Sequence, residues 1–255
     1  MPLPTPWTLS AVECDALIAT TTPPASVVVI IPARNEATTV GSVLDAVFAA
    51  GSLVRDVVVV DDHSSDDTAT VAERHGARVL TLTSPTGKGG AMAAGVAATD
   101  ADIIVFLDAD VTSPSAHYVP RLVAPLLARD HIGLVKGFYL RPLHDMPTGG
   151  GRVNELTARP ALSLLHPGLG EIRQPLAGET AIRRSLLEQC PLATSYRVEI
   201  ALLLDVAAQY GVDAIAQVDL GIRRHRNRPL EELRPMATEI LGVILERSGV
   251  ALPPR

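Results

Sequence analysis

Asp108 and Asp110 are two carboxylates one residue apart, and they directly follow the apolar run 103–107. Hard divalent cations such as Mg²⁺ and Mn²⁺ prefer one or two carboxylates together with substrate phosphate oxygens, so this pair suits a metal-bound nucleotide. A chain with 28 acidic residues among 255 contains about one Asp-x-Asp triplet by chance. Residues 100–102 form a second triplet, so the position of the pair has to decide its meaning.

One predicted strand separates the two triplets. In open α/β sheets ligands bind beyond the carboxyl ends of the strands, where Asp108 and Asp110 lie, whereas the triplet 100–102 lies at the opposite end. The polar segments 32–36 (Pro-Ala-Arg-Asn-Glu) and 61–64 (Asp-Asp-His-Ser) follow two other predicted strands. Three strand ends are therefore predicted to meet in one site for a metal or a nucleotide; the simpler interpretation is a solvated strand end with incidental acids.

Two glycine-rich segments each precede a predicted helix. Residues 86–90 read Thr-Gly-Lys-Gly-Gly, and residues 149–152 read Gly-Gly-Gly-Arg. Backbone N–H groups at a helix N-terminus suit an anion, although the spacing around Lys88 is not that of a Walker loop. If both segments bind anions, one substrate carries a diphosphate and the other a phosphate or carboxylate. Otherwise they are a flexible loop and a plain hinge.

Residues 223–228 contain four arginines in six positions of a chain whose net charge is −6. Arginine binds phosphate and carboxylate bidentately, so the segment is either an anion site or a solvated basic loop. Within it, His225 could complete a metal shell with Asp110. Glu199 begins an otherwise apolar helix, where it either favours the helix dipole or points at a sugar hydroxyl.

Strands and helices alternate through the first half of the chain. Strands are predicted at 27–31, 54–60, 78–82 and 103–107, with helices at 39–50, 67–75 and 89–98. The second half is predicted to contain a strand at 132–140, a loop at 141–151, a helix from 152, a helix at 199–210, a strand at 214–218 and a helix at 230–247. This pattern predicts an α/β, Rossmann-like fold with a mostly parallel sheet and helices on both faces.

We expect an irregular N-terminal arm over residues 1–25, which is rich in Pro and Thr and carries one short helix. A single domain is predicted for 26–255, with a nucleotide-binding half at 26–112 and an acceptor half at 113–255. The length is compatible with one α/β domain.

Composition narrows the class of protein. Apolar residues make up 47 % and aromatic residues 3 %, so a large aliphatic core is expected. The net charge of −6 argues against nucleic acid or an anionic membrane as a partner. Two cysteines, Cys14 and Cys190, form no disulfide framework. No leader pattern and no apolar stretch of about 18 residues is present, so a soluble, cytoplasmic protein is expected.

The Pro-Ala-x-Asn-Glu strand end, the Asp-x-Asp pair and the helix-covered sheet resemble nucleotide-sugar glycosyltransferases of the GT-A type. Further segments are similar to the glucosyl-3-phosphoglycerate synthase family over roughly 26–250. The segments that carry this similarity are 86–89, 135–136, 149–153, 155–156, 158–160, 174–176, 178–179, 198–200, 213–218 and 225–230.

The resemblance implies transfer of glucose, with retention, from a nucleoside diphosphate sugar, usually UDP-glucose, to the 2-hydroxyl of 3-phosphoglycerate. It also implies a divalent cation (Mg²⁺ or Mn²⁺), a homodimer, no covalent nucleophile, and attack from the face of the leaving diphosphate. The leaving group itself would then help to take the acceptor proton.

The resemblance also implies roles for individual residues. The donor would be held by Pro32, Ala33, Arg34, Glu36, Asp62, Lys88, Asp108, Ala109, Leu176, Gly178, Glu199 and Arg228. The acceptor would be held by Gly151, Arg152, Asn154 and Asn227. The metal would be held by Asp110 and His225, and catalysis would involve these two residues and Glu199.

The chain departs from the family at three of these or neighbouring positions. Asn154 stands where the family has Thr, Asp62 where it tends to have Ser, and Thr180 where it has a bulkier aromatic residue. The loops before Gly87 and Gly149 are also shorter. Asp62 adds negative charge beside a nucleotide, whereas Asn154 can still donate a hydrogen bond with a longer reach.

Other functions remain open at this point. They are a related transferase with a different small anionic acceptor, an inverting transferase to a polyprenyl phosphate or polysaccharide, a sugar-1-phosphate nucleotidyltransferase, and a non-catalytic nucleotide-sugar binder. The second lacks the aromatic acceptor motif of processive synthases, and the third lacks its Gly- and Arg-containing loop after the first strand.

Overall fold

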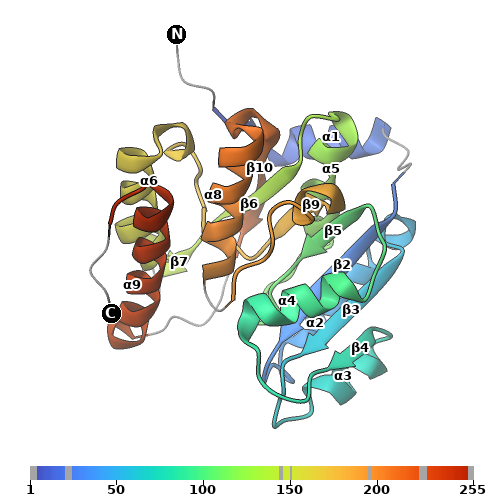
Figure 1. Cartoon of the computed structure of the whole chain (residues 1–255). Helices are drawn as coiled ribbons and strands as arrows, with labels where there is room; N and C mark the ends of the chain where they lie inside the picture. Colours follow the sequence, from blue (N-terminus) through green and yellow to red (C-terminus); the bar gives the residue numbers. More distant parts are fainter. Residues whose placement is uncertain are drawn as a thin grey trace.

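A computed structural model describes residues 5–20, 25–143, 146–149, 151–194, 197–223 and 229–251. Its centre is an eight-stranded sheet with the strand order β1-β10-β6-β9-β5-β2-β3-β4 (Figure 1). Every neighbouring pair is parallel except the two that involve β9. The predicted mostly parallel α/β fold is confirmed.

The strands β2, β3 and β5 coincide with β-branched runs of the sequence, because such side chains fit a pleated, buried surface. The strands of the sheet are β1 (Trp7–Leu9), β2 (Val27–Ala33), β3 (Asp56–Asp61), β4 (Arg78–Thr81), β5 (Ile103–Phe106), β6 (Leu134–Leu140), β9 (Thr180–Arg183) and β10 (Ile215–Ile222). A separate hairpin consists of β7 (Pro142–Leu143) and β8 (Met146–Gly149).

Helices cover both faces of the sheet. They are α1 (Ala11–Thr20), α2 (Val40–Phe48), α3 (Thr68–Arg74), α4 (Gly87–Ala97), α5 (Tyr118–Ala128), α6 (Arg159–Leu165), α7 (Arg184–Leu187), α8 (Val198–Tyr210) and α9 (Leu230–Arg247). Short turns are η1 (Gly51–Leu53), η3 (Pro167–Leu169), η5 (Val212–Ala214) and the π-helical η2 (Asn154–Ala158), which continues into α6. In the part of the chain that is described, no helix is both long and apolar enough to span a membrane.

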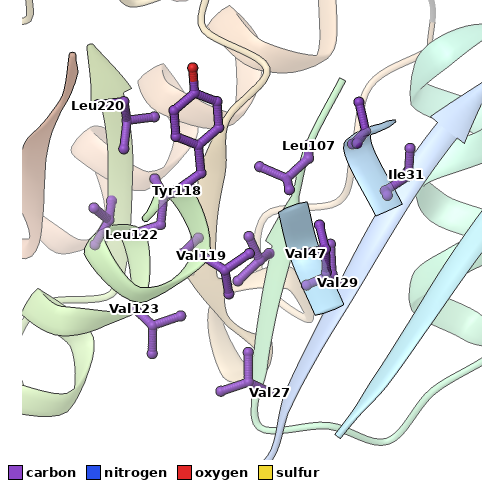
Figure 2. Packing of buried hydrophobic residues seen from close by; sticks show 14 of the residues in the cluster. Val27, Val29, Ile31, Val47, Leu107, Tyr118, Val119, Leu122, Val123 and Leu220 are labelled. Carbon is purple, nitrogen blue, oxygen red and sulfur yellow. The ribbon is translucent and has the colours of Figure 1, made fainter. Parts of the chain in front are cut away.

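Alternation along β2 divides the core into two layers. Val27, Val29 and Ile31 pack with α2 and α5 on one face (Figure 2), whereas Val28 and Ile30 pack on the other, whose cluster includes residues of α4, α8 and α9. Successive strand side chains point to opposite faces, so a continuous apolar run serves both layers. Both faces of the sheet are therefore buried, and its carboxyl edge is left for a ligand.

Residues 7–9, expected in an irregular arm, instead form β1 at the edge of the sheet. Their backbone pairs with β10, and the guanidinium of Arg129 lies 3.6 Å from the Trp7 ring centre. Arg121 holds Asp15 of α1 with two hydrogen bonds of 2.8 and 2.9 Å. A strand of only three residues that follows a Pro-rich segment carries almost no local signal. Its partner strand is distant in sequence, since Thr8 and its hydrogen-bond partner Gln217 are 209 positions apart.

Three other elements also differ from the sequence-based expectation. Residues 141–151, expected as a loop, include the hairpin β7–β8. Helix α5 was not predicted, since Pro120 and Pro125 weaken its helical pattern. Strand β9 was not predicted either, because it is four residues long and follows a Pro- and Gly-containing turn. It is the element that joins the two halves of the sheet, because it pairs with both β5 and β6.

Candidate active site

A cavity of about 490 Å³ lies at the carboxyl edge of the sheet. Predicted residues from both halves of the chain line it: Pro32, Ala33, Arg34, Glu36, Asp62, Lys88, Asp108, Ala109, Asp110, Gly151, Arg152, Asn154, Leu176 and Glu199. The second Asp-x-Asp triplet lies at the opposite edge, where Asp100 pairs with Arg55 and Asp102 accepts hydrogen bonds from Ser26. Position thus separates the two triplets as expected.

The loops after β2 and β3 are tied to each other. Asn35, at φ 56°, donates its backbone N–H to Ser64 Oγ at 2.9 Å and accepts from the Ser65 N–H at 2.8 Å. His63 also has a left-handed backbone, at φ 62°. Asparagine tolerates this region better than most residues, and the reciprocal hydrogen bonds hold both strand ends as one wall of the cavity.

Asp108 lies between two cations. Lys88 Nζ lies 2.6 Å from its Oδ1, and Arg223 Nη2 lies 2.8 Å from its Oδ2. Burial by itself raises the pKa of the Asp108 carboxyl, but the charges of Lys88 and Arg223 outweigh it and hold that pKa well below the ordinary range. Asp108 is therefore ionised, and both of its oxygens have a partner.

Lys88 also reaches across the cavity to Glu199, at 2.5 Å between Nζ and Oε1. Desolvation lowers the pKa of the Lys88 ammonium, but Asp108 and Glu199 outweigh this, so its pKa lies above the usual lysine value. The contact brings the first turn of α8 against the first turn of α4. The interpretation of Lys88 as a solvated lysine on a flexible loop is wrong.

Arg223 is buried and contacts four side chains. It donates from Nη1 to Tyr139 Oη at 2.7 Å and to Glu179 at 3.0 Å, and from Nη2 to Asp108 and to Asp110 Oδ1 at 3.0 Å. Desolvation opposes its charge, but Glu179 and the other neighbours raise its pKa well above the ordinary arginine value. Arg223 therefore belongs to an internal charge network and not to a solvated basic loop.

Lys136 is buried behind the turn that precedes β9. Its Nζ donates to the Ala177 carbonyl at 2.5 Å and to Thr180 Oγ1 at 3.0 Å. Desolvation lowers the pKa of Lys136 to about 8. Gly178, in the same turn, does not line the cavity but backs Asp108, because a Cβ on Gly178 would lie 2.1 Å from Asp108 Oδ1.

Of the residues predicted to hold an acceptor, Gly151 lines the cavity with a φ of +73°, which favours glycine. Asn154 is buried, and its Nδ2 donates to Glu155 Oε1 at 2.9 Å and to the Arg173 carbonyl at 3.1 Å. Both amide N–H groups are thus used within the protein. The expectation that Asn154 donates a hydrogen bond to an acceptor molecule is not met in this arrangement.

The cavity is completed by Gly87 and Arg223, which belong to the predicted anion-binding segments 86–90 and 223–228. It also includes residues to which the sequence assigned no role: Ala91, Tyr139, Arg141, Val153, Leu233 and Met236. Arg223 opens the arginine-rich segment and Tyr139 lies near the end of a predicted strand, so both had a weak signal. Leu233 and Met236 have none, because they read as ordinary apolar positions of α9. Of the predicted residues, His225, Asn227 and Arg228 lie outside the described residues.

A divalent cation fits the side chains present. Asp110 lines the cavity with 45 % of its side chain exposed, and within the described part of the chain Arg223 contacts its Oδ1 and no side chain contacts its Oδ2. One hard carboxylate oxygen is left toward a cavity large enough for a diphosphate and water, which are the other ligands such cations prefer. Among the described residues, no three acidic, histidine or cysteine side chains form a metal-binding group.

The sheet with an Asp-x-Asp pair and a donor-sized cavity at its carboxyl edge defines a glycosyltransferase of the GT-A type. Residues 28–190 match the family model for glycosyl transferase family 2. The chain belongs to this family and, within it, to the glucosyl-3-phosphoglycerate synthases.

Curated relatives carry the narrower assignment. The glucosyl-3-phosphoglycerate synthase of Mycobacterium tuberculosis is 44 % identical over 96 % of this chain and 78 % of its own length. That of Petrotoga mobilis is 41 % identical over 85 % of this chain and 71 % of its own.

Solved structures agree with this assignment. The M. tuberculosis enzyme in complex with Mn²⁺, UDP-glucose and phosphoglyceric acid matches with a TM-score of 0.84 at 43 % identity, over 99 % of this chain and 89 % of that one. Its complex with Mn²⁺, UDP and glucosyl-3-phosphoglycerate matches with a TM-score of 0.83 at 42 % identity, over 98 % and 89 % of the two chains.

Proposed function

We propose that the protein transfers glucose from UDP-glucose to 3-phosphoglycerate, with retention, in a reaction that depends on a divalent cation. The observation that carries this proposal is the single cavity in which Asp108, Asp110, Lys88 and Glu199 meet. The relatives and their complexes with Mn²⁺, UDP-glucose and phosphoglyceric acid support the choice of substrates.

The donor nucleotide lies along the ends of β2 and β3, against Pro32, Ala33, Arg34 and Glu36. Lys88, at the first turn of α4, binds the diphosphate and exchanges its present contact with Glu199 for phosphate oxygens. Glu199 is then released to accept a hydrogen bond from a glucose hydroxyl. Ala109 and Leu176 border the same space, and Arg228, which lies outside the described residues, would contact the diphosphate as the resemblance implies.

Asp110 and His225 would hold the cation, which would supply positive charge to the leaving diphosphate. Lys88 adds positive charge on the same side. Because negative charge develops on the diphosphate as the glycosidic bond breaks, Lys88 stabilises the transition state more than the ground state. Asp108 accepts from two cations and cannot act as a free nucleophile toward the sugar. As the resemblance to the family implies, the acceptor hydroxyl attacks from the leaving-group face, and its proton passes to a diphosphate oxygen, which gives retention.

The acceptor binds beside Gly151, Arg152, Asn154 and Asn227. Arg152 supplies a cation for its carboxylate or phosphate. A second candidate is a related transferase with another small anionic acceptor. It is favoured by one observation, namely that both N–H groups of Asn154 are already used by Glu155 and Arg173.

One experiment tests the proposal and separates the two candidates. Purified protein with Mn²⁺ or Mg²⁺ is offered UDP-glucose and a panel of acceptors that includes 3-phosphoglycerate. Release of UDP is followed, and the product is analysed by mass and by the anomeric coupling constant in its NMR spectrum. An α-glucosylated 3-phosphoglycerate is expected. Glucosylation of another acid in the panel, but not of 3-phosphoglycerate, would favour the second candidate. A β-linked product would refute retention.

We also propose a homodimer. Leu156 and Leu164, on the consecutive elements η2 and α6, expose 75 % and 82 % of their surface, and a second subunit would remove such apolar side chains from water. Light scattering on the purified protein tests this, with a molecular mass of twice 26.9 kDa expected.

We further propose a cytoplasmic location, which is supported by two buried cysteines that are both free, as is usual in a reducing compartment. Fractionation of cells that produce the protein tests it, with the protein expected in the soluble cytosolic fraction.

A further inference from the structure

Asp62 follows β3 at the carboxyl edge of the sheet, and only 4 % of its surface is exposed. Its Oδ1 accepts hydrogen bonds from the Thr86 backbone N–H at 2.6 Å and from Thr86 Oγ1 at 2.9 Å. Its Oδ2 accepts from the Gly87 backbone N–H at 2.9 Å. Both oxygens of this carboxylate are therefore directed at the loop that begins α4.

These hydrogen bonds stabilise the N-terminus of helix α4. The first N–H groups of a helix lack partners within it, and a carboxylate that accepts from them gains both a charge-assisted hydrogen bond and a favourable interaction with the helix dipole. No hydrogen bond from the side chain of Thr86, the residue before α4, caps this helix. Asp62, which directly follows β3, caps the N-terminus of α4 instead, because its carboxylate accepts from the Thr86 and Gly87 N–H groups.

The same loop is held on its other side by close backbone packing. A Cβ on Gly89 would lie 1.8 Å from the Ala193 carbonyl oxygen, so the first turn of α4 cannot move toward that backbone. Gly87 has φ +75°, which lets the chain turn sharply into the helix. The hydrogen bonds to Asp62 and the packing against Ala193 fix the backbone around Lys88. From this position its side chain reaches Asp108 and Glu199.

We infer that Asp62 is a positioning residue that acts through residues 86–87 on Lys88, and not a direct contact of the nucleotide. The inference rests on the proposed function, because it concerns how the diphosphate of the donor is bound. A serine at this position has one oxygen and no charge, so it cannot make the three contacts that Asp62 makes. The aspartate accounts for how this chain holds its short loop before Gly87.

A double-mutant cycle with Lys88 tests the inference. UDP and uridine binding are measured by calorimetry in the presence of Mn²⁺ for the wild type, Asp62→Ala, Lys88→Ala and the double variant. Asp62→Ala is expected to weaken UDP binding by about tenfold, the effect of losing a charge-assisted hydrogen bond, and to leave uridine binding unchanged. In the Lys88→Ala background the same substitution is expected to change UDP binding by less than about twofold.

Two further variants guard against a trivial loss of folding. Asp62→Ser keeps one acceptor and is expected to fall between the wild type and Asp62→Ala. Asp61→Asn is the matched control, since Asp61 is equally buried at the end of the same strand. Among the described residues, its carboxylate accepts a hydrogen bond only from the Ser64 N–H, at 3.1 Å. This control variant is expected to bind UDP like the wild type.

The outcomes separate the inference from the proposed function. If the wild type binds UDP and the effects of Asp62→Ala and Lys88→Ala simply add, or if uridine binding falls as well, Asp62 contacts the nucleotide directly and the inference is wrong. If the wild type binds no UDP with Mn²⁺, the proposed function itself fails. Loss of UDP binding in Asp62→Ala but not in the Lys88→Ala background supports the inference.

Discussion

Arg223 and Glu179 form an ion pair that water does not reach. The guanidinium Nη1 lies 2.9 Å from Glu179 Oε1, and 3 % and 0 % of the two side chains are exposed. Through Nη2 the same guanidinium holds Asp108 and Asp110. Glu179, the residue before β9, thus supports the carboxylate pair that follows β5.

Removing one partner of this pair is expected to be costly. Glu179→Gln leaves a buried guanidinium without its main counter-charge, which lowers the free energy of unfolding by about 3 kcal/mol. Urea denaturation measures the change. Asp100→Asn is the control, because it breaks an ion pair with Arg55 in which both side chains are largely exposed, and about 0.5 kcal/mol or less is expected there. Equal effects of the two substitutions would contradict a structural role for Glu179.

Lys136 predicts an unusual dependence of stability on pH. Burial lowers its pKa from 10.5 to about 8, so between these values the unfolded chain binds more protons than the folded one. Stability then rises with pH across this window, by up to about 3 kcal/mol, because the cost of a buried charge is lost as Lys136 deprotonates.

The measurement compares the wild type with Lys136→Met. The free energy of unfolding of the wild type, relative to that of the variant, is expected to be constant below pH 8 and to increase between pH 8 and 10.5. A difference that stays flat, or falls, over that range would show that Lys136 keeps an ordinary pKa in the folded protein.

Asp110 is expected to bind the cation with its remaining carboxylate oxygen. Asp110→Asn should weaken Mn²⁺ binding to the UDP complex by at least about tenfold, measured by electron paramagnetic resonance of free Mn²⁺. Asp102→Asn is the matched control from the other Asp-x-Asp triplet, at the opposite end of β5. Asp102 accepts from Ser26 and lies outside the cavity lining, so unchanged Mn²⁺ binding is expected. Wild-type affinity in Asp110→Asn would remove Asp110 from the metal site.

Gly178 leaves no room for a side chain beside Asp108. A Cβ there would lie 2.1 Å from Asp108 Oδ1, so Gly178→Ala must displace the carboxylate or the turn. A displacement of this size is expected to lower kcat/KM by about a hundredfold. Gly170→Ala is the control, because its Cβ would meet Ser163 Oγ at 3.0 Å away from the cavity lining. Full activity of Gly178→Ala would mean that the turn has more freedom than the packing indicates.

Local patterns were enough to predict several elements of the fold and the edge of the sheet at which the cavity lies. The β-branched run 27–31 predicted β2, and helix α9 begins and ends at the residues expected from its spacing. Asp108 and Asp110 were assigned to the ligand-binding edge from their place after a strand, and the cavity includes both. These inferences hold because strand ends of a parallel sheet share an edge, which follows from chain direction alone.

The partners of these residues could not be predicted in the same way. Asp62 was expected to face a nucleotide, yet its carboxylate points to residues 86–87. Arg223 was part of a basic segment with two possible interpretations, and only the fold selects one. Both cases depend on side-chain direction at a loop, for which the sequence has no periodicity.

By itself, then, the sequence determined the α/β class, the parallel strands around β2 and the edge at which Asp108 and Asp110 would lie, because alternation and chain direction are local properties. The tertiary structure alone decided that antiparallel β9 lies between β5 and β6 and brings Glu179 to Arg223, 44 positions away, and that Arg223 reaches Asp108, 115 positions away. Such pairings depend on strand order, which is set by the packing of the whole sheet.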